Sequence, residues 1–412
     1  MKLFRQIIHL SLINLFGLPA LAQENTALPA ASAHALAPLA PQDRWVARVE
    51  LRSNSYDQRY NSNGKSESLG AAFDGVALDA NVFPALLALG ANASLGTTAL
   101  STEVTTKRVE LTLGYGVTQD LTVGGIINFG STQNQVGVSL AGGNVGWNPQ
   151  FDANQAVGVN NFPFAPLTTG AVAAMTPADI NQILANPAFG YEYAPLAGSK
   201  TSGPGEVIVG AMWRFHKSHH DNLVWGLGLR KSLADADDPD NLFDVPLDDG
   251  SDDLLTQLEY FRHWAAVDLR GLIKRTIQSS DEVIMRVPAP GEVLATAVSK
   301  EKLNRNLGNF WEYDLELGYR WSDWRTSATW HRWQKSADHY SSNLGSNTTA
   351  LEANTNIDTN QWRLALSWSG INAWKEGNIP MPLVVKLELQ ETYEGHNMVD
   401  VRDIYLLTTT FF

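Results

Sequence analysis

Carboxylates crowd one short stretch of the chain, where their oxygens could bind a divalent cation. Ca²⁺ prefers such oxygens, but the stretch has neither the Gly at position six nor the Glu at position twelve of an EF-hand loop. We therefore expect a solvated acidic loop, which divalent cations could bridge to lipopolysaccharide, rather than a dedicated metal site. Its acidic residues are Asp235, Asp237, Asp238, Asp240, Asp244, Asp248, Asp249, Asp252 and Asp253.

Other catalytic chemistry finds little support in the sequence. The absence of cysteine excludes thiolate metal sites, disulfides and a Cys nucleophile. His216, His219 and His220 lie together, but the segment is typical of a solvated turn. Ser and His occur without the G-x-S-x-G elbow of a hydrolase. We predict no catalytic residue, no metal site and no cofactor.

Composition narrows the class of protein further. The 412 residues carry 30 Lys and Arg against 43 Asp and Glu, a formal net charge of -13, which argues against a nucleic-acid partner. Charged residues make up 18% of the chain, below the roughly 25% of soluble domains. With 13 tryptophans, this composition points away from an ordinary soluble enzyme.

The N-terminus has the form of an export signal. Lys2 and Arg5 precede an apolar stretch, and Ala20-Leu21-Ala22 is a small-residue cleavage site. We interpret residues 1–22 as a signal peptide and residues 23–43 as a flexible Ala/Pro-rich segment. The alternative, an uncleaved anchor, is disfavoured because the apolar stretch is short.

The rest of the chain alternates with a period of two, the pattern of β-strands. In one segment Trp311, Tyr313, Leu315, Leu317 and Tyr319 alternate with Glu312, Asp314, Glu316 and Arg320. An antiparallel sandwich also alternates. Short and long connections, however, follow one another in turn, as in transmembrane barrels with short periplasmic turns and long outer loops.

These patterns predict an all-β fold: a transmembrane antiparallel β-barrel over residues 44–412. About twelve strands are expected, and ten or fourteen remain possible because strand boundaries are uncertain by roughly two to four residues. A turn is expected near Phe261–His263. The predicted strands are 44–53, 103–117, 121–130, 205–215, 222–232, 252–260, 264–276, 309–321, 324–336, 360–369, 381–392 and 399–412.

Aromatic residues support the same fold. Most tryptophans fall in or beside the predicted strands, where their rings suit the membrane–water boundary, and Trp321 and Trp324 flank one short turn. The chain ends in Phe411-Phe412, which is similar to the terminal signal that the outer-membrane assembly machinery reads. We therefore expect that machinery to be a partner through Phe412.

Charged residues on the polar face of the strands must face the barrel interior, because the other face meets lipid. They could line a polar conduit, or they could pair and fill a narrow barrel, and the second interpretation is favoured. The lumen candidates are Arg48, Arg52, Arg108, Glu110, Arg214, Glu312, Glu316, Arg320 and Arg363.

Two long loops, 54–102 and 131–204, carry apolar and aromatic residues. Thr176-Pro177-Ala178-Asp179 predicts a helix start in the second loop. We hypothesise that both loops fold over the mouth and offer an access site for hydrophobic molecules; the alternative is a rigid cap that packs on itself. The candidates for binding at this site are Phe162, Phe164, Phe189, Tyr191 and Tyr193.

Three motifs in residues 203–260 are Gly203-Pro204-Gly205-Glu206, Gly226-Leu227-Gly228-Leu229-Arg230 and Asp248-Asp249-Gly250-Ser251. They resemble the core of the outer-membrane family associated with the meta-pathway of phenol degradation, itself similar to long-chain fatty-acid transporter barrels. Ser232-Leu233-Ala234 replaces the family's usual Pro-Thr-Gly. The resemblance covers about a third of the chain. It implies passive uptake of hydrophobic or aromatic small molecules, without catalysis.

We therefore expect a channel in the outer membrane of a Gram-negative bacterium, in contact with outer-membrane lipid and lipopolysaccharide. The alternative is a structural or partner-binding barrel with a plugged lumen and no role in transport.

Overall fold

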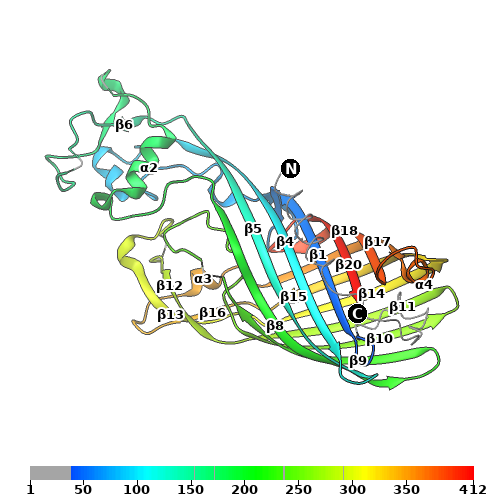
Figure 1. Ribbon diagram of the computed structural model, residues 1–412. Helices are drawn as coiled ribbons and strands as arrows, with labels where there is room; N and C mark the ends of the chain where they lie inside the picture. Colours follow the sequence, from blue (N-terminus) through cyan, green and yellow to red (C-terminus); the bar gives the residue numbers. More distant parts are fainter. Residues whose placement is uncertain (1–38, 153, 171, 235–236, 291) are drawn as a thin grey trace.

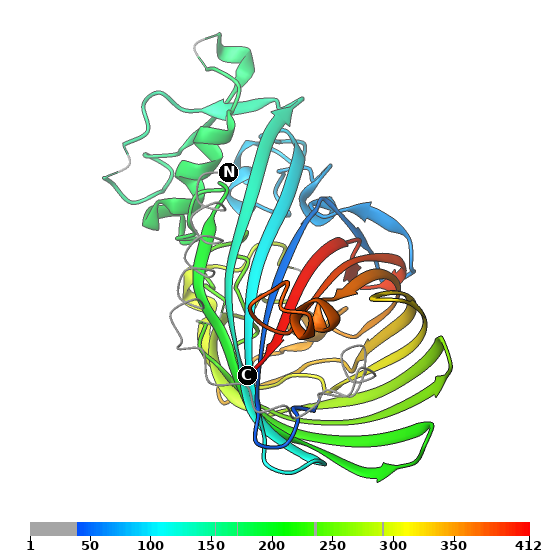
Figure 2. The same ribbon diagram turned by 45° about the vertical axis from the view of Figure 1, so that its right-hand side comes forward.

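The computed structural model describes residues 39–152, 154–170, 172–234, 237–290 and 292–412. The predicted signal peptide, residues 1–22, and most of the segment 23–43 lie outside these residues and stay predictions. The described residues from Trp45 onwards build one closed barrel with additional structure at one end (Figures 1 and 2).

Twelve antiparallel strands form the wall, which confirms the predicted fold and strand number. Each pairs with its neighbour along the chain. The wall strands are β1 (Trp45–Tyr56), β4 (Thr97–Gly116), β5 (Leu121–Ala141), β8 (Lys200–Lys217), β9 (Asp221–Ser232), β10 (Asp253–Trp264), β11 (Val267–Gln278), β14 (Phe310–Trp321), β15 (Trp324–Lys335), β17 (Ile357–Ser369), β18 (Leu383–His396) and β20 (Arg402–Phe411).

The first and last wall strands close the barrel. Val46 of β1 pairs with Phe411 of β20, and β1 also pairs with β4 on its other side. Beyond the ladder, the Phe412 amide donates to the Trp45 carbonyl at 3.1 Å. No edge of the wall is left unpaired, as hydrocarbon demands of a sheet.

Burial across the wall is the reverse of that in a soluble protein. On β14, Leu315 and Leu317 are 53% and 57% exposed on the outside, whereas Asp314 and Glu316 are 6% and 5% exposed on the inside. Because apolar residues alternate with charged ones, the strand places apolar side chains against lipid on one face and charged side chains in the enclosed lumen on the other. No helix in the described ranges is long and apolar enough to span a membrane.

The connections at one end are mostly short. Trp321 and Trp324 flank the two-residue turn between β14 and β15, as expected. The predicted turn near Phe261–His263 is wrong: these residues continue β10, where Phe261 is fully buried, and the chain turns at Ala265 with a positive φ of 49°. A longer connection between β17 and β18 contains helix α4 (Ile371–Lys375).

Two strands are much longer than predicted. Residues 97–102 extend β4 and residues 131–141 extend β5, although we expected both segments to be loop. The extra residues pair with each other, from Thr97 with Ala141 onwards. The two strands project beyond the rest of the rim and carry a folded unit, here called the cap (Figure 1).

The cap and the other outer connections contain short elements. In the cap these are the 3₁₀ helices η1 (Ala71–Phe73), η2 (Pro84–Leu89), η3 (Leu167–Thr169) and η4 (Pro187–Phe189), helix α2 (Pro177–Ala185), and strands β6 (Val145–Trp147) and β7 (Phe164–Pro166). Elsewhere they are β2 (Gln58–Tyr60), β3 (Ser66–Ser68), β12 (Asp281–Arg286), η5 (Ala297–Ser299), β13 (Lys300–Asn306), β16 (His339–Ser342), α3 (Thr349–Glu352) and β19 (Met398–Val399).

Candidate functional site

The cap has a closed hydrophobic core built from both long loops. Leu86 of η2 and Ile183 of α2 are fully buried in it, so the two long loops pack against each other. Helix α2 begins where the sequence predicted: Thr176 Oγ1 accepts from the Asp179 amide at 3.3 Å, and the Asp179 carboxylate accepts from the Thr176 amide at 2.8 Å. These two bonds satisfy donors that a helix N-terminus leaves free.

The proposed access-site residues lie within this core. Phe164, Tyr191 and Tyr193 are buried, and Phe162 and Phe189 are half-buried. Phe164 meets the rings of Phe162 and Phe189 at centroid distances of 5.8 and 6.3 Å. The geometry favours the alternative of a cap that packs on itself, and binding of hydrophobic molecules at these residues stays a prediction.

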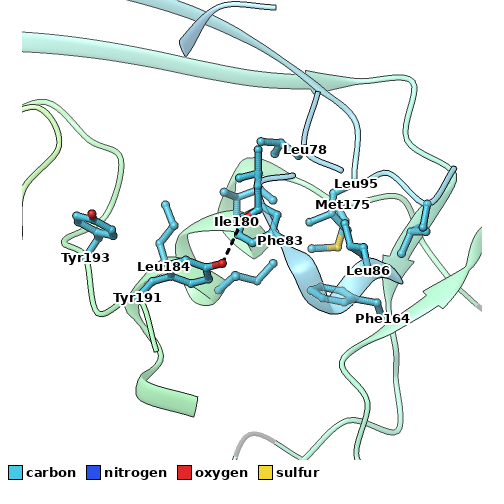
Figure 3. Close-up of a cluster of buried hydrophobic side chains, with 14 residues drawn as sticks. Leu78, Phe83, Leu86, Leu95, Phe164, Met175, Ile180, Leu184, Tyr191 and Tyr193 are labelled. Atoms are coloured by element: carbon cyan, nitrogen blue, oxygen red, sulfur yellow. Dashed lines mark hydrogen bonds between the residues drawn. The ribbon is translucent and has the colours of Figure 1, made fainter. Parts of the chain in front are cut away.

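The hydroxyl groups of the two buried tyrosines donate hydrogen bonds to backbone carbonyls of this chain. Tyr191 donates to the Val82 carbonyl at 3.1 Å (Figure 3), and Tyr193 donates to the Ala295 carbonyl at 2.8 Å. Burial raises the pKa of both phenols, although the charge of Arg286 opposes the effect at Tyr193. Arg286 of β12 lies over the Tyr193 ring, 3.9 Å from its centroid. The cap is thereby attached to the β12–β13 hairpin.

The lumen candidates all project into the barrel, and nearly all are held by ion pairs. Arg48 pairs with Glu110, Arg52 with Asp403 at 2.8 Å, and Glu312 with Lys274 at 2.7 Å. Arg214 pairs with Asp120 at the periplasmic end, at 2.8 Å. This arrangement favours the interpretation of charges that pair and fill the barrel.

The pairs join into a network on β11, β14, β15, β17 and β18, here called the ion-paired wall. Arg325 bridges Glu316 and Asp268 at 2.5 and 2.6 Å, and Arg320 lies 3.4 Å from Asp268. Arg363 lies 3.6 Å from Asp314 and donates to Gln390 at 2.6 Å. Large side chains therefore occupy the lumen on this side.

Arg108 is different from the other lumen candidates. Its guanidinium donates to the Leu247 carbonyl at 3.2 Å, and no carboxylate in the described part of the chain lies within ion-pair distance. The side chain is exposed although it points into the barrel, because it faces a cavity of about 700 Å³ at the outer mouth. Charged residues such as Asp248 and apolar residues such as Leu247 and Trp333 both line the cavity, which lies between the wall and the connections that follow β9 and β13.

The acidic loop between β9 and β10 forms part of this mouth. Arg230 of β9 lies 3.4 Å from Asp248 and 2.9 Å from Asp249. Burial raises the pKa of Asp248 to about 6, whereas Arg230 and bonds from Ser251 outweigh burial and lower the pKa of Asp249. No group of three or more His, Asp or Glu side chains in the described ranges could hold a metal ion.

A row of glycines faces the lumen on β4, β5, β8 and β9, here called the glycine wall. Gly114 pairs with Gly124, Gly124 with Gly210, and Gly210 with Gly228, so four neighbouring strands lack a side chain at one level. A Cβ at Gly124 would lie 2.4 Å from the Leu113 carbonyl oxygen. The strands therefore approach too closely for any other residue at that position.

The glycine wall leaves a second cavity, of about 220 Å³, below the mouth. Most of its lining is apolar, from Ile126, Ile208, Met212 and Leu255 together with the glycines. Thr112, Thr122, Gln257 and Lys274 also border it. The two cavities lie along the same strands: Arg108 borders the upper one and Thr112 of the same strand borders the lower. The two cavities thus lie at successive levels on one side of the barrel, and the ion pair of Glu110 with Arg48 lies at the level between Arg108 and Thr112.

Sequence reasoning missed this row. The signal was present, because strand periodicity places Gly114, Gly124, Gly210 and Gly228 on the polar face of their strands. The sequence pattern does not specify the register between neighbouring strands, however, and that register is what aligns the four glycines.

No protein-family model and no curated protein sequence matches the chain. An outer-membrane channel from Pseudomonas putida F1 is similar in structure, with 11% identity, a TM-score of 0.50, and coverage of 90% of this chain and 96% of that one.

Two further structures align less well. The Ralstonia pickettii toluene transporter TbuX gives 10% identity and a TM-score of 0.35, with 90% and 89% coverage of this chain and that one. The translocator domain of the autotransporter NalP from Neisseria meningitidis gives 8% identity and a TM-score of 0.37, with coverage of 89% of this chain and 87% of that one. Scores this low do not separate transporters from translocators. The likeness to the Pseudomonas putida channel shows the fold of this chain, an outer-membrane β-barrel of twelve strands.

Proposed function

We propose that the chain is a channel of the bacterial outer membrane for passive uptake of hydrophobic, including aromatic, small molecules, and that it has no catalytic role. The observation that carries this proposal is the glycine wall with its apolar pocket beneath the mouth. The likeness to an outer-membrane channel supports it at the level of the fold.

The shape of the free space argues for apolar solutes. Ion pairs fill the opposite side of the lumen, so a solute must move along the glycine wall. There it meets Ile126, Ile208 and Leu255, which offer few hydrogen bonds to replace the water of a sugar or an ion. An aromatic or aliphatic molecule loses little on leaving water and gains contact with these residues.

The test is uptake of a labelled aromatic hydrocarbon by Gram-negative cells that lack their general porins, with and without the chain. We expect the chain to raise hydrocarbon uptake and to leave sugar uptake unchanged. Equal hydrocarbon uptake in both strains would contradict the proposal and favour the alternative of a partner-binding barrel with a plugged lumen.

A deletion of residues 160–195 tests the access-site hypothesis separately. It removes α2 and the aromatic residues of the cap while leaving the wall strands intact. If hydrophobic molecules enter through the cap, uptake by the deletion variant falls. Unchanged uptake would assign the cap a structural role without affecting the proposal for the barrel.

A further inference from the structure

Arg275 is a cation on the lipid-facing side of the barrel without an anionic partner in the described part of the chain. It lies on β11, three residues before the strand ends at Gln278, and its register partner is Trp311. The guanidinium lies over the Trp311 ring, 5.0 Å from the centroid. Its Nε is buried and has no hydrogen-bond partner among the described residues.

The other outward-facing arginines of the wall strands are paired. Arg332 lies 2.8 Å from Asp358, Arg262 lies 3.5 Å from Asp221, and Arg402 lies 2.5 Å from Glu391. A cation facing lipid is unfavourable unless it lies near the head groups or has a counter-charge. Arg275 therefore lacks the carboxylate partner that each of these three arginines has.

An apolar groove of about 550 Å³ begins at Arg275 and runs across the outside of β8, β9, β10 and β11. Leu258 and Ile273 line it between Trp311 and the pair Trp213 and Trp225. The Trp225 indole already donates to Thr256 at 3.0 Å, so the ring presents only apolar surface to the groove. Such a groove facing a bilayer is filled by a hydrocarbon chain.

The position of Arg275 decides which leaflet supplies that chain. It lies at the end of the barrel that carries the long connections and the cap, the outer end in barrels of this kind. The lipid of the outer leaflet there is lipopolysaccharide, whose lipid A combines acyl chains with phosphate groups. Guanidinium binds phosphate through paired hydrogen bonds.

We propose that the groove binds one lipid A, with a phosphate on Arg275 and an acyl chain between Trp311 and Trp225. The site does not depend on transport. The phosphate would accept from the terminal nitrogens of the half-buried Arg275 side chain, and the aromatic rings would hold the acyl chain against the wall.

The test is native mass spectrometry of the detergent-purified barrel after addition of bisphosphorylated lipid A, dephosphorylated lipid A or phosphatidylglycerol. We expect the wild-type barrel to retain the bisphosphorylated lipid at least about fivefold more than either of the others. The variant R275Q should lose that preference. The matched variant R332Q, whose arginine is paired with Asp358, should keep it.

Three results would overturn the proposal: equal retention of the phosphorylated and dephosphorylated lipids, equal retention of phosphatidylglycerol, or unchanged retention by R275Q. The comparison among lipids uses the wild-type barrel alone, so it decides the matter even if a variant fails to fold.

Discussion

The two sides of the barrel interior differ in how much of the lumen their side chains occupy. The ion-paired wall fills its half of the lumen with long charged side chains, in which Asp268 and Arg325 are buried and satisfy each other. The glycine wall leaves its half without side chains at the level of Gly124 and Gly210. In a barrel of about twelve strands there is little room for an open pore. The position of the free space therefore depends on where side chains are missing.

The largest effect should come from breaking the ion-paired wall. The variant D268A removes one of the two carboxylates that Arg325 bridges, together with the contact to Arg320. The buried guanidinium is then only partly compensated, by Glu316, which should cost about 3 kcal/mol of unfolding free energy. Guanidinium unfolding in detergent micelles, followed by tryptophan fluorescence, measures this loss.

A matched control is E282Q, which removes an ion pair with Lys302 on the exposed β12–β13 hairpin. Exposed pairs contribute about 1 kcal/mol or less. If D268A were no more destabilising than E282Q, the network would not be what stabilises this side of the barrel.

The next largest effect should come from filling the glycine wall. A Cβ at Gly228 would have its nearest neighbours at 3.4 Å, so the variant G228L can fold while its side chain enters the apolar pocket. We expect hydrocarbon uptake to fall at least about tenfold, equivalent to roughly 1.4 kcal/mol on the barrier.

Gly271 provides the control, because it lies on the lipid-facing side of β11 and a Cβ added to it would have no neighbour within 4 Å among the described residues. The variant G271L should transport normally. Normal uptake by G228L would show that solutes do not pass along the glycine wall.

The smallest effect concerns the mouth above the glycine wall, where Asp248 and Asp249 share Arg230. Because the pKa of Asp248 is raised to about 6, its contribution to stability is full at about pH 4 and is lost as the pH rises through about 6. The variant D248N should therefore stabilise the barrel at about pH 8, by on the order of 1 kcal/mol, and change little at about pH 4.

The variant D249N should do the opposite. The pKa of Asp249 is lowered, so its carboxylate stabilises the fold at neutral pH and stops doing so in acid. Unfolding curves at the two pH values measure both effects. The same sign for both variants would contradict the different roles of the two carboxylates.

The sequence predicted the wall well and the interior poorly, for physical reasons. Lipid on one face enforces alternation, so residues such as Leu315 and Glu316 reveal their strand directly. Beyond the membrane both faces of β4 and β5 can be polar. Residues 131–135 of β5 are all polar, so the segment 131–141 was expected to be loop although Val136, Val138 and Leu140 alternate at its end. The partners of Arg325 and the alignment of Gly124 with Gly210 depend on register between strands, which period-two alternation does not specify.

The closure of β1 on β20 has a consequence for biogenesis. Val46 finds its partner only when Phe411 has been synthesised and exported, so almost the whole polypeptide must be present before the cylinder can seal. Such long-range pairing is intrinsically slow. A chain that lost only its last ten residues would keep eleven wall strands but would leave the backbone groups at two strand edges unpaired in the lipid. Periplasmic proteases would readily degrade such a product.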